Sequence, residues 1–167
     1  MKQENLYAGE GVIRTVSGIY INVFEPKESY IDINDIAHAL SCQPRFGGHL
    51  RYFYPVAMHS VCCSEFVEKG YELEALLHDA SEAYLLDIPS PIKCRLSNYK
   101  EIEDNLMAII SKKFGFNYPL SQQVKDVDKK MLENEWDAMV VGDIMQIDIS
   151  PSHAKRAFLE RYNFLTN

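Results

Sequence analysis

Apolar residues recur three or four positions apart along most of the chain, and this spacing predicts a nearly all-helical fold. Residues 96–116 illustrate the pattern: Leu106, Ile109 and Ile110 form a stripe that we expect to be buried, and Gly115 is a natural helix stop. The same spacing predicts helices over residues 56–69, 72–86, 96–116, 121–141 and 150–165, and a further helix that begins near residue 32.

Capping residues and prolines define the expected helix ends. Side chains of Ser, Asp and Asn accept hydrogen bonds from the free N–H groups of a first helical turn. Pro44 ends the first helix, and Pro55 lies at a favoured position for starting the second. The expected N-caps are Asp32 or Asn34, then Ser121, then Ser150 or Ser152.

The N-terminal part of the chain has a different pattern. Residues 12–24, VIRTVSGIYINVF, are rich in β-branched and aromatic side chains, and Ser17-Gly18 interrupts them as a turn does. We therefore expect a small β-hairpin within an N-terminal extension, residues 1–30. The chain has 167 residues and shows no linker or repeat, so residues 1–167 are interpreted as a single all-α domain that carries this hairpin.

Charge and composition exclude several classes of partner. The chain is 47% hydrophobic and 25% charged, which is typical of a globular protein. Its formal net charge of -7 argues against a basic surface for duplex nucleic acid or for an anionic membrane. There is no apolar run of roughly 20 residues, and the four cysteines have no CxxC spacing. We expect a cytoplasmic protein with reduced thiols; self-association into a homo-oligomer is left open.

An unusual polar cluster interrupts the apolar pattern of residues 72–86. His78, Asp79 and Glu82 occur in the segment ALLHDASEAYLL, where leucine would otherwise serve. Successive helical residues lie about 100° apart, so on a continuous helix these three side chains share one edge. Burying such an edge without partners costs several kcal/mol, and a metal ion would satisfy it.

Two distant residues extend this cluster. His59 occurs among apolar residues of the segment VAMHSV, and Asp128 occurs beside Val127 on another predicted helix. Each has a plainer interpretation, as a hydrogen-bonded core histidine or as a solvated charge. Asp126 competes with Asp128, but the two are about 200° apart on a helix, and Asp128 shares the side of the neighbouring apolar residues. A site of mixed nitrogen and oxygen ligands suits Mn, Fe, Co, Ni or Zn, with Mg also possible.

The order of these residues resembles a known signature. His59, then His78-Asp79, then Asp128 is similar to the H…HD…D pattern of the HD superfamily of metal-dependent phosphohydrolases. Within that superfamily, HDASEAYLLDIPSPIK resembles the corresponding motif of bacterial deoxyribonucleotide 5'-nucleotidases. The resemblance implies a helical HD domain that holds one divalent metal through His59, His78, Asp79 and Asp128.

The resemblance also implies the roles of other side chains. Glu82, together with Asp79, belongs to the catalytic group, with Glu82 positioning water or moving its proton. The residues expected to contact substrate are Arg45 and Lys93, with Asp87 near the sugar or water network and His49 and Arg51 as weaker candidates. Phe46, Tyr52 and Phe53 are aromatic residues that could stack on a base, although core packing is the commoner role.

The function implied is hydrolysis of a nucleotide, with a deoxyribonucleoside monophosphate as the favoured substrate. The nucleotidases carry arginine, tryptophan and threonine early in the chain, whereas this chain has CQPRFGGHLRYFYP, so the substrate stays open. The alternatives are a deoxynucleoside triphosphate triphosphohydrolase, a cyclic-nucleotide phosphodiesterase and a non-catalytic nucleotide-binding module. A helical DNA-binding domain is disfavoured because the chain has no cluster of Lys and Arg.

Overall fold

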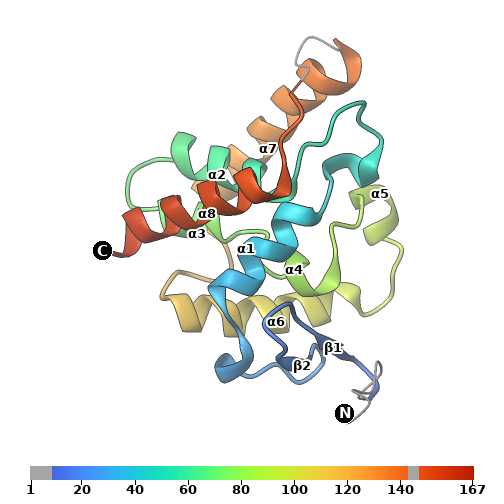
Figure 1. The fold of residues 1–167 in the computed structure, drawn as a ribbon, viewed down its shortest axis with the longest axis vertical. Helices are drawn as coiled ribbons and strands as arrows, with labels where there is room; N and C mark the ends of the chain where they lie inside the picture. Colours follow the sequence, from blue (N-terminus) through green and yellow to red (C-terminus); the bar gives the residue numbers. More distant parts are fainter. Residues whose placement is uncertain (1–8, 143–146) are drawn as a thin grey trace.

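The structure is a computed structural model and describes residues 9–142 and 147–167. Most of these residues are helical, with a two-stranded antiparallel hairpin near the N-terminus (Figure 1), which confirms the predicted fold class. Residues 1–8 of the predicted N-terminal extension lie outside the described residues. No helix of the described segments is both long and apolar enough to cross a lipid bilayer.

The helices follow one another with short connections. Within residues 9–142 and 147–167, three short segments have other helical geometry: the 3-10 turns η1 (Glu28–Tyr30) and η2 (Arg45–Gly48), and the π-helix η3 (Trp136–Val141). The α-helices of the described residues are α1 (Ile33–Cys42), α2 (Val56–Phe66), α3 (Glu72–Leu76), α4 (Glu82–Leu85), α5 (Ser90–Lys93), α6 (Tyr99–Phe114), α7 (Gln122–Glu135) and α8 (Pro151–Thr166).

Helix α1 lies at the centre of the bundle. It packs against α2, α4 and α8, and Figure 1 shows it running between α8 and α4. Ile36, Ala37 and Leu40 are fully buried on its inner face, and Phe158 of α8 is a fully buried side chain of the same core. Burial of apolar surface of this kind is the main favourable contribution to folding. The helical spacing seen in the sequence therefore marks the true core face.

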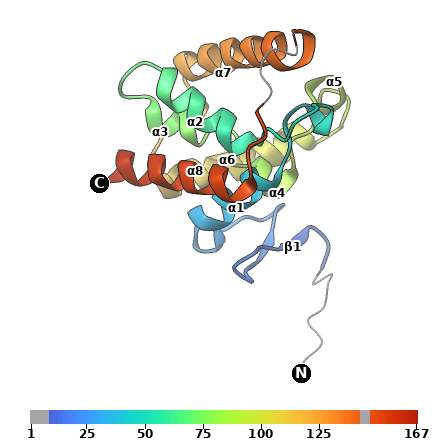
Figure 2. The same ribbon diagram turned by 45° about the horizontal axis from the view of Figure 1, so that its top comes forward.

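The hairpin is fastened to the bundle by a buried carboxylate. Strands β1 (Val12–Arg14) and β2 (Tyr20–Asn22) pair with Ile13 opposite Ile21. Asp35 of α1 is buried and accepts hydrogen bonds from the backbone N–H of Ser17 at 3.0 Å and from its hydroxyl at 2.7 Å. The predicted turn at Ser17-Gly18 is thus held by α1, at the end of the molecule opposite to α7 (Figure 2).

The helix caps agree with the sequence in detail. At each of the three predicted helix starts, an expected side chain accepts a hydrogen bond from the first turn of the helix. Where the sequence offered two candidates for the N-cap, the first of the two is the cap. Gly115 has a left-handed φ of 75° and ends α6, as predicted. The capping residues are Asp32, Ser121 and Ser150.

The single helix predicted over residues 72–86 is wrong. The structure has α3, then a turn over residues 77–81, then α4. In this turn Ala80 N–H donates to the carbonyl of Leu77, and Glu82 N–H donates to the carbonyl of Asp79, so the bonds span three residues instead of four. The polar cluster consequently lies on a tight turn instead of on one helix edge.

Other helix boundaries differ by smaller amounts. The helix predicted over residues 56–69 ends at Phe66, because Val67 adopts an extended conformation after its N–H bonds the Cys63 carbonyl. The helix predicted over residues 121–141 changes from α to π geometry at Trp136. Single π-turns of this kind are rare and occur often at functional sites.

Candidate metal centre

Four side chains from three separate elements converge at one place, where three of them are buried and Asp128 is partly exposed. His59 of α2, Cys63 of α2, His78 of the turn after α3 and Asp128 of α7 each offer one ligand atom, and these atoms all lie within 4.8 Å of one another. His59 and Cys63 are fully buried and His78 is 7% exposed. A buried group of nitrogen, sulfur and carboxylate donors at this spacing could hold one transition-metal ion.

Helix α7 is docked so that Asp128 faces the histidines. Val124 and Val127 of α7 pack against Cys63 and Ala75 in a small apolar cluster. Asp128 follows Val127 in the chain, and its Oδ1 lies 3.0 Å from Nε2 of His59 and 3.6 Å from Nε2 of His78. Asp126, the competing carboxylate of the sequence argument, is exposed and accepts a hydrogen bond from Gln122 at the surface.

His59 is oriented by a second carboxylate that sequence reasoning missed. Its Nδ1 donates to Oε1 of Glu135 at 2.9 Å, which leaves Nε2 directed at the cluster. Metal-binding histidines commonly donate their second N–H to a carboxylate in this way, which fixes the ring and raises its basicity. Glu135 is seven residues after Asp128, so two helical turns place both on one side of α7, and this spacing was the available signal.

His78 has a complementary arrangement. Its Nδ1 donates to the carbonyl of Ala75 at 2.7 Å. Its Nε2 is buried and makes no hydrogen bond, although Oδ2 of Asp79 lies 3.2 Å away. Buried polar atoms almost always have a partner, so an orphaned ring nitrogen beside carboxylates requires an explanation. A cation bound by this nitrogen satisfies it, and the donor set therefore fits a metal ion.

The electrostatics of the cluster favour positive charge at its centre. Burial alone lowers the pKa of His59 and His78. At His59 the hydrogen bond with Asp128 outweighs burial, and at His78 the negative charge of Asp79 does so, and both pKa values therefore rise well above the usual range. Burial opposes ionisation of Asp128, yet its hydrogen bond with His59 and the positive charges of both histidines lower its pKa well below the usual range. A divalent cation supplies the positive charge that these carboxylates favour.

Asp79 and Cys63 differ from the ligand set implied by the resemblance. Asp79 contacts His78 and lines the adjoining pocket, but it is not one of the four donors that lie within 4.8 Å of one another. Cys63 is one of these four donors, and its Sγ lies 3.5 Å from Nε2 of His59. All four cysteines are free, as expected. Cys63 is four residues after His59 on the same helix face, and a thiol shifts the preference towards softer ions such as Zn.

Glu82 is beside the cluster and only partly paired. It is 7% exposed, and its Oε2 has no hydrogen-bond partner. Burial, followed by the negative charges of Asp79 and Asp87, raises its pKa well above the usual range. Lys93 Nζ lies 3.9 Å from Glu82 Oε1 but makes a closer ion pair, at 2.5 Å, with Glu103. A buried carboxylate with one free oxygen is suited to accept a proton.

Arg45 is held in a buried ion pair at the other side of the cluster. Its Nη2 and Nε donate to Oε2 of Glu135 at 2.8 and 3.2 Å. Burial opposes its charge, but Glu135 and then Asp79 more than compensate, and the pKa of Arg45 is raised. Arg45 thus shares Glu135 with the metal-cluster histidine His59.

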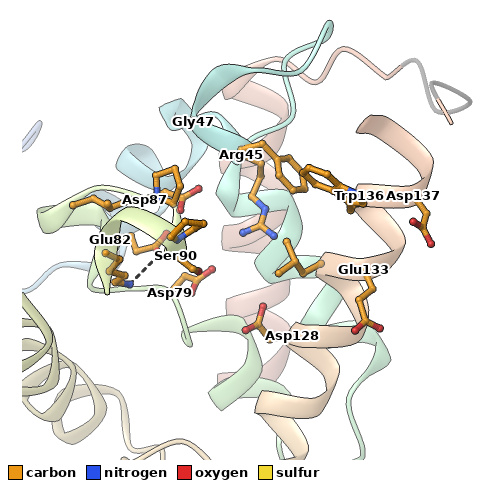
Figure 3. Close-up of a pocket in the computed structure, with 16 residues that line it drawn as sticks. Arg45, Gly47, Asp79, Glu82, Asp87, Ser90, Asp128, Glu133, Trp136 and Asp137 are labelled. Carbon is orange, nitrogen blue, oxygen red and sulfur yellow. Dashed lines mark ion pairs between the residues drawn. The ribbon is translucent and has the colours of Figure 1, made fainter. Parts of the chain in front are cut away.

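A pocket of about 770 Å³ adjoins the cluster, and Asp128 is the one of the four donors that lines it. We call the cluster side of this pocket its floor and the side that carries Trp136 its mouth. Figure 3 shows Asp79, Glu82, Asp87 and Ser90 along one wall, the α7 side chains Asp128 and Glu133 with Trp136 and Asp137 along the other, and Arg45 pointing between them. The structure therefore brings most of the predicted site residues to one place. Trp136, Glu133 and Asp137 line the pocket and were missed, because the sequence carries no motif around them.

The structure does not bring every predicted residue into this pocket. Arg45, Lys93, Asp87 and Phe46 line it. His49 is exposed and lies outside its lining, as do Arg51 and the aromatic pair Tyr52 and Phe53. Asp87 is placed by its neighbour Gln43, whose side chain accepts the backbone N–H of Asp87 and donates to the carbonyl of Glu82.

Comparison with known proteins places the chain in a family. No family profile matches it. It is 38% identical to the uncharacterized protein YfdR of Escherichia coli over 169 aligned residues, which cover 92% of this chain and 95% of that protein. The chain belongs to the YfdR family. An uncharacterized Rhodobacter capsulatus protein is 34% identical over 122 residues, covering 67% of this chain and 62% of that protein.

This member of the YfdR family therefore combines three chemical elements. It has a buried group of nitrogen, sulfur and oxygen donors, a carboxylate with a free oxygen at Glu82, and cationic side chains at Arg45 and Lys93. Candidate metal donors, a partly paired carboxylate and two cations are thus brought together beside one pocket.

Proposed function

We propose that this protein is an HD-superfamily metal-dependent phosphohydrolase that removes phosphate from deoxyribonucleoside 5'-monophosphates. The observation that carries the proposal is the convergence of His59, Cys63, His78 and Asp128, whose ligand atoms lie within 4.8 Å of one another, beside a pocket that Asp128 lines. The H…HD…D order of the sequence supports the superfamily, and the neighbouring Asp79 completes its motif.

The residues around the cluster have distinct roles in this reaction. His59, His78 and Asp128, joined by Asp79 or Cys63, would hold the ion. When bound, a divalent cation supplies Lewis-acid activation of water and of phosphoryl oxygens. Arg45 and Lys93 provide positive charge for the phosphate within a pocket whose other charged lining residues are carboxylates.

Glu82 moves the proton. Its free Oε2 accepts a proton from water as the water oxygen bonds to phosphorus. The bond between phosphorus and the 5' oxygen breaks, its electron pair leaves with the 5' oxygen, and that oxygen takes up the proton from Glu82. The products are inorganic phosphate and a deoxyribonucleoside. The raised pKa of Glu82 suits a group that takes and returns a proton in one cycle.

A substrate screen tests the proposal. Protein loaded with Mn, Co or Zn is offered ribo- and deoxyribonucleoside mono-, di- and triphosphates and cyclic nucleotides, and the released group is identified. We expect orthophosphate from deoxyribonucleoside monophosphates. Release of triphosphate would instead assign the protein as a triphosphohydrolase, and ring opening of cyclic nucleotides as a phosphodiesterase. Binding without release from any nucleotide would favour a non-catalytic module.

A further inference from the structure

The pocket has an apolar side that the proposed chemistry does not use. Trp136 lines it with 49% of its surface exposed, and Leu132, one helical turn earlier on α7, is 40% exposed. Phe46 and Pro89 line the same pocket. Large apolar side chains left open to solvent inside a concave pocket mark a place where a ligand is bound.

Trp136 is part of a built aromatic group. Its ring lies 5.9 Å from the ring of Phe46 at an interplanar angle of 57°, and the guanidinium of Arg45 lies 5.4 Å from the centre of the Phe46 ring. Phe46 has a left-handed φ of 54°, a conformation that non-glycine residues rarely adopt. Such strain persists only where the surroundings enforce it, and it occurs often at ligand-binding segments.

The aromatic group is tied to the metal cluster through adjacent residues. Arg45 directly precedes Phe46, and Glu135 directly precedes Trp136. The ion pair between Arg45 and Glu135 therefore joins the two segments that carry the aromatic rings. Because Glu135 also holds His59, the platform and the metal donors have a common support.

We propose that Trp136, backed by Phe46, is the stacking platform for the nucleobase of the substrate. This inference rests on the proposed function and names its substrate class, an ester with an aromatic base. The pocket volume of about 770 Å³ is within the range of sites for small organic ligands and exceeds the needs of a phosphate alone. Every base has a π-face, so stacking on an indole selects for a base without choosing among bases.

The chain allows a direct optical test, because Trp136 is its single tryptophan. Metal-loaded Glu82→Gln protein, which should bind without turnover, is titrated with dAMP and separately with 2-deoxyribose 5-phosphate, which has the same sugar and phosphate but no base. We expect dAMP to change the tryptophan fluorescence in a saturable way and the base-free ester to leave it nearly unchanged. Equal responses to both ligands, or none to dAMP, would overturn the proposal.

Kinetics of the variants give a second readout. Trp136→Leu should raise KM for dAMP roughly 10-fold with little change in kcat, whereas Trp136→Phe should retain most of the affinity. Phe66→Leu replaces a 73% exposed aromatic of α2 that lies outside the pocket lining, and it serves as the matched control. An unchanged KM in a folded Trp136→Leu protein would contradict the platform.

The two proposals can fail separately. A fluorescence response specific to the base, without release of phosphate from any nucleotide, would support the stacking platform and contradict the proposed hydrolase activity. Rapid hydrolysis of dAMP with the same KM in wild type and Trp136→Leu would support the proposed hydrolase activity and contradict the stacking platform.

Discussion

The floor and the mouth of the pocket differ in how their side chains are held. At the floor, His59 and His78 are buried and each ring is fixed by a hydrogen bond to Glu135 or to the carbonyl of Ala75. At the mouth, Trp136 is half exposed and is held by ring packing on Phe46. The floor is preorganised, as a metal centre requires, whereas the mouth can adapt to a ligand.

This difference separates two kinds of contribution. Changes at the floor should abolish metal binding or turnover, because directed hydrogen bonds have little tolerance for displacement. Changes at the mouth should alter substrate affinity and leave the chemistry intact. Glu135 is the residue that joins the two, since it contacts both His59 and Arg45.

The largest effect is expected for Asp128→Asn. Loss of this carboxylate from the floor should reduce bound metal and lower kcat by on the order of 10³-fold, beyond the ~10- to 100-fold typical of residues that only support a ligand. Metal content by mass spectrometry and turnover of dAMP are the measurements. Asp126→Asn, two residues away and exposed, is the matched control and should match wild type. Equal metal content in both variants would contradict the assignment.

Glu82→Gln separates chemistry from metal binding. The substitution preserves shape but removes the proton acceptor, so kcat should fall about 10²- to 10⁴-fold while metal content stays at the wild-type level. Glu133→Gln changes a pocket-lining carboxylate at the mouth and should change kcat by no more than about twofold. If the two variants lost activity equally, the role of Glu82 would be electrostatic and not specific to its free oxygen.

Glu135→Gln tests the link between floor and mouth. The neutral side chain weakens the hold on His59 and leaves the buried Arg45 without its counter-charge. We expect metal affinity and kcat to fall roughly 10- to 100-fold, together with a rise in KM. Titration with Co²⁺ followed by absorption measures the affinity independently of turnover. Recovery of metal affinity and kcat in Glu135→Asp would support a role of Glu135 in positioning His59. A fall in thermal stability alone in Glu135→Gln would argue for a purely structural role.

The smallest effect on activity is expected at the hairpin, which is far from both the floor and the mouth of the pocket. Asp35→Ala removes the buried acceptor of two hydrogen bonds from Ser17 and should destabilise the protein by about 1–3 kcal/mol. Urea unfolding gives this free energy, and kcat per folded molecule should stay unchanged. Ser17→Ala keeps the hydrogen bond from the backbone N–H of residue 17 to Asp35, so it should lower the free energy of unfolding by less. A large loss of turnover in folded Asp35→Ala would show that the hairpin supports the pocket.

The helical fold could be predicted from the sequence because apolar spacing and capping are short-range rules, whereas the ligand set His59, His78, Asp79 and Asp128 was implied by a resemblance to a known motif. Apolar spacing identified the faces of α1 and α6, and capping chemistry identified Asp32 and Ser121. The preference for Asp128 over Asp126 followed from helical rotation, and the structure places Asp128 beside the histidines.

The features that the sequence did not predict depend on tertiary contacts, which no local sequence pattern encodes. The turn over residues 77–81 interrupts a segment whose apolar spacing is helical, and it is stabilised where Nδ1 of His78 bonds the Ala75 carbonyl. Glu135 and Trp136 gain their importance from Arg45 and Phe46, 90 residues away along the chain. His49 shares a loop with Arg45, yet proximity in sequence did not bring it to the pocket.

We propose that one divalent ion is held by side chains from α2, the turn after α3, and α7. Diffraction at the absorption edge of Co or Zn, from crystals of the loaded protein, tests it most directly. We expect one strong anomalous peak about 2.0–2.2 Å from Nε2 of His59, Nε2 of His78 and a carboxylate oxygen of Asp128. A peak outside coordinating range of either histidine, in fully loaded protein, would contradict it.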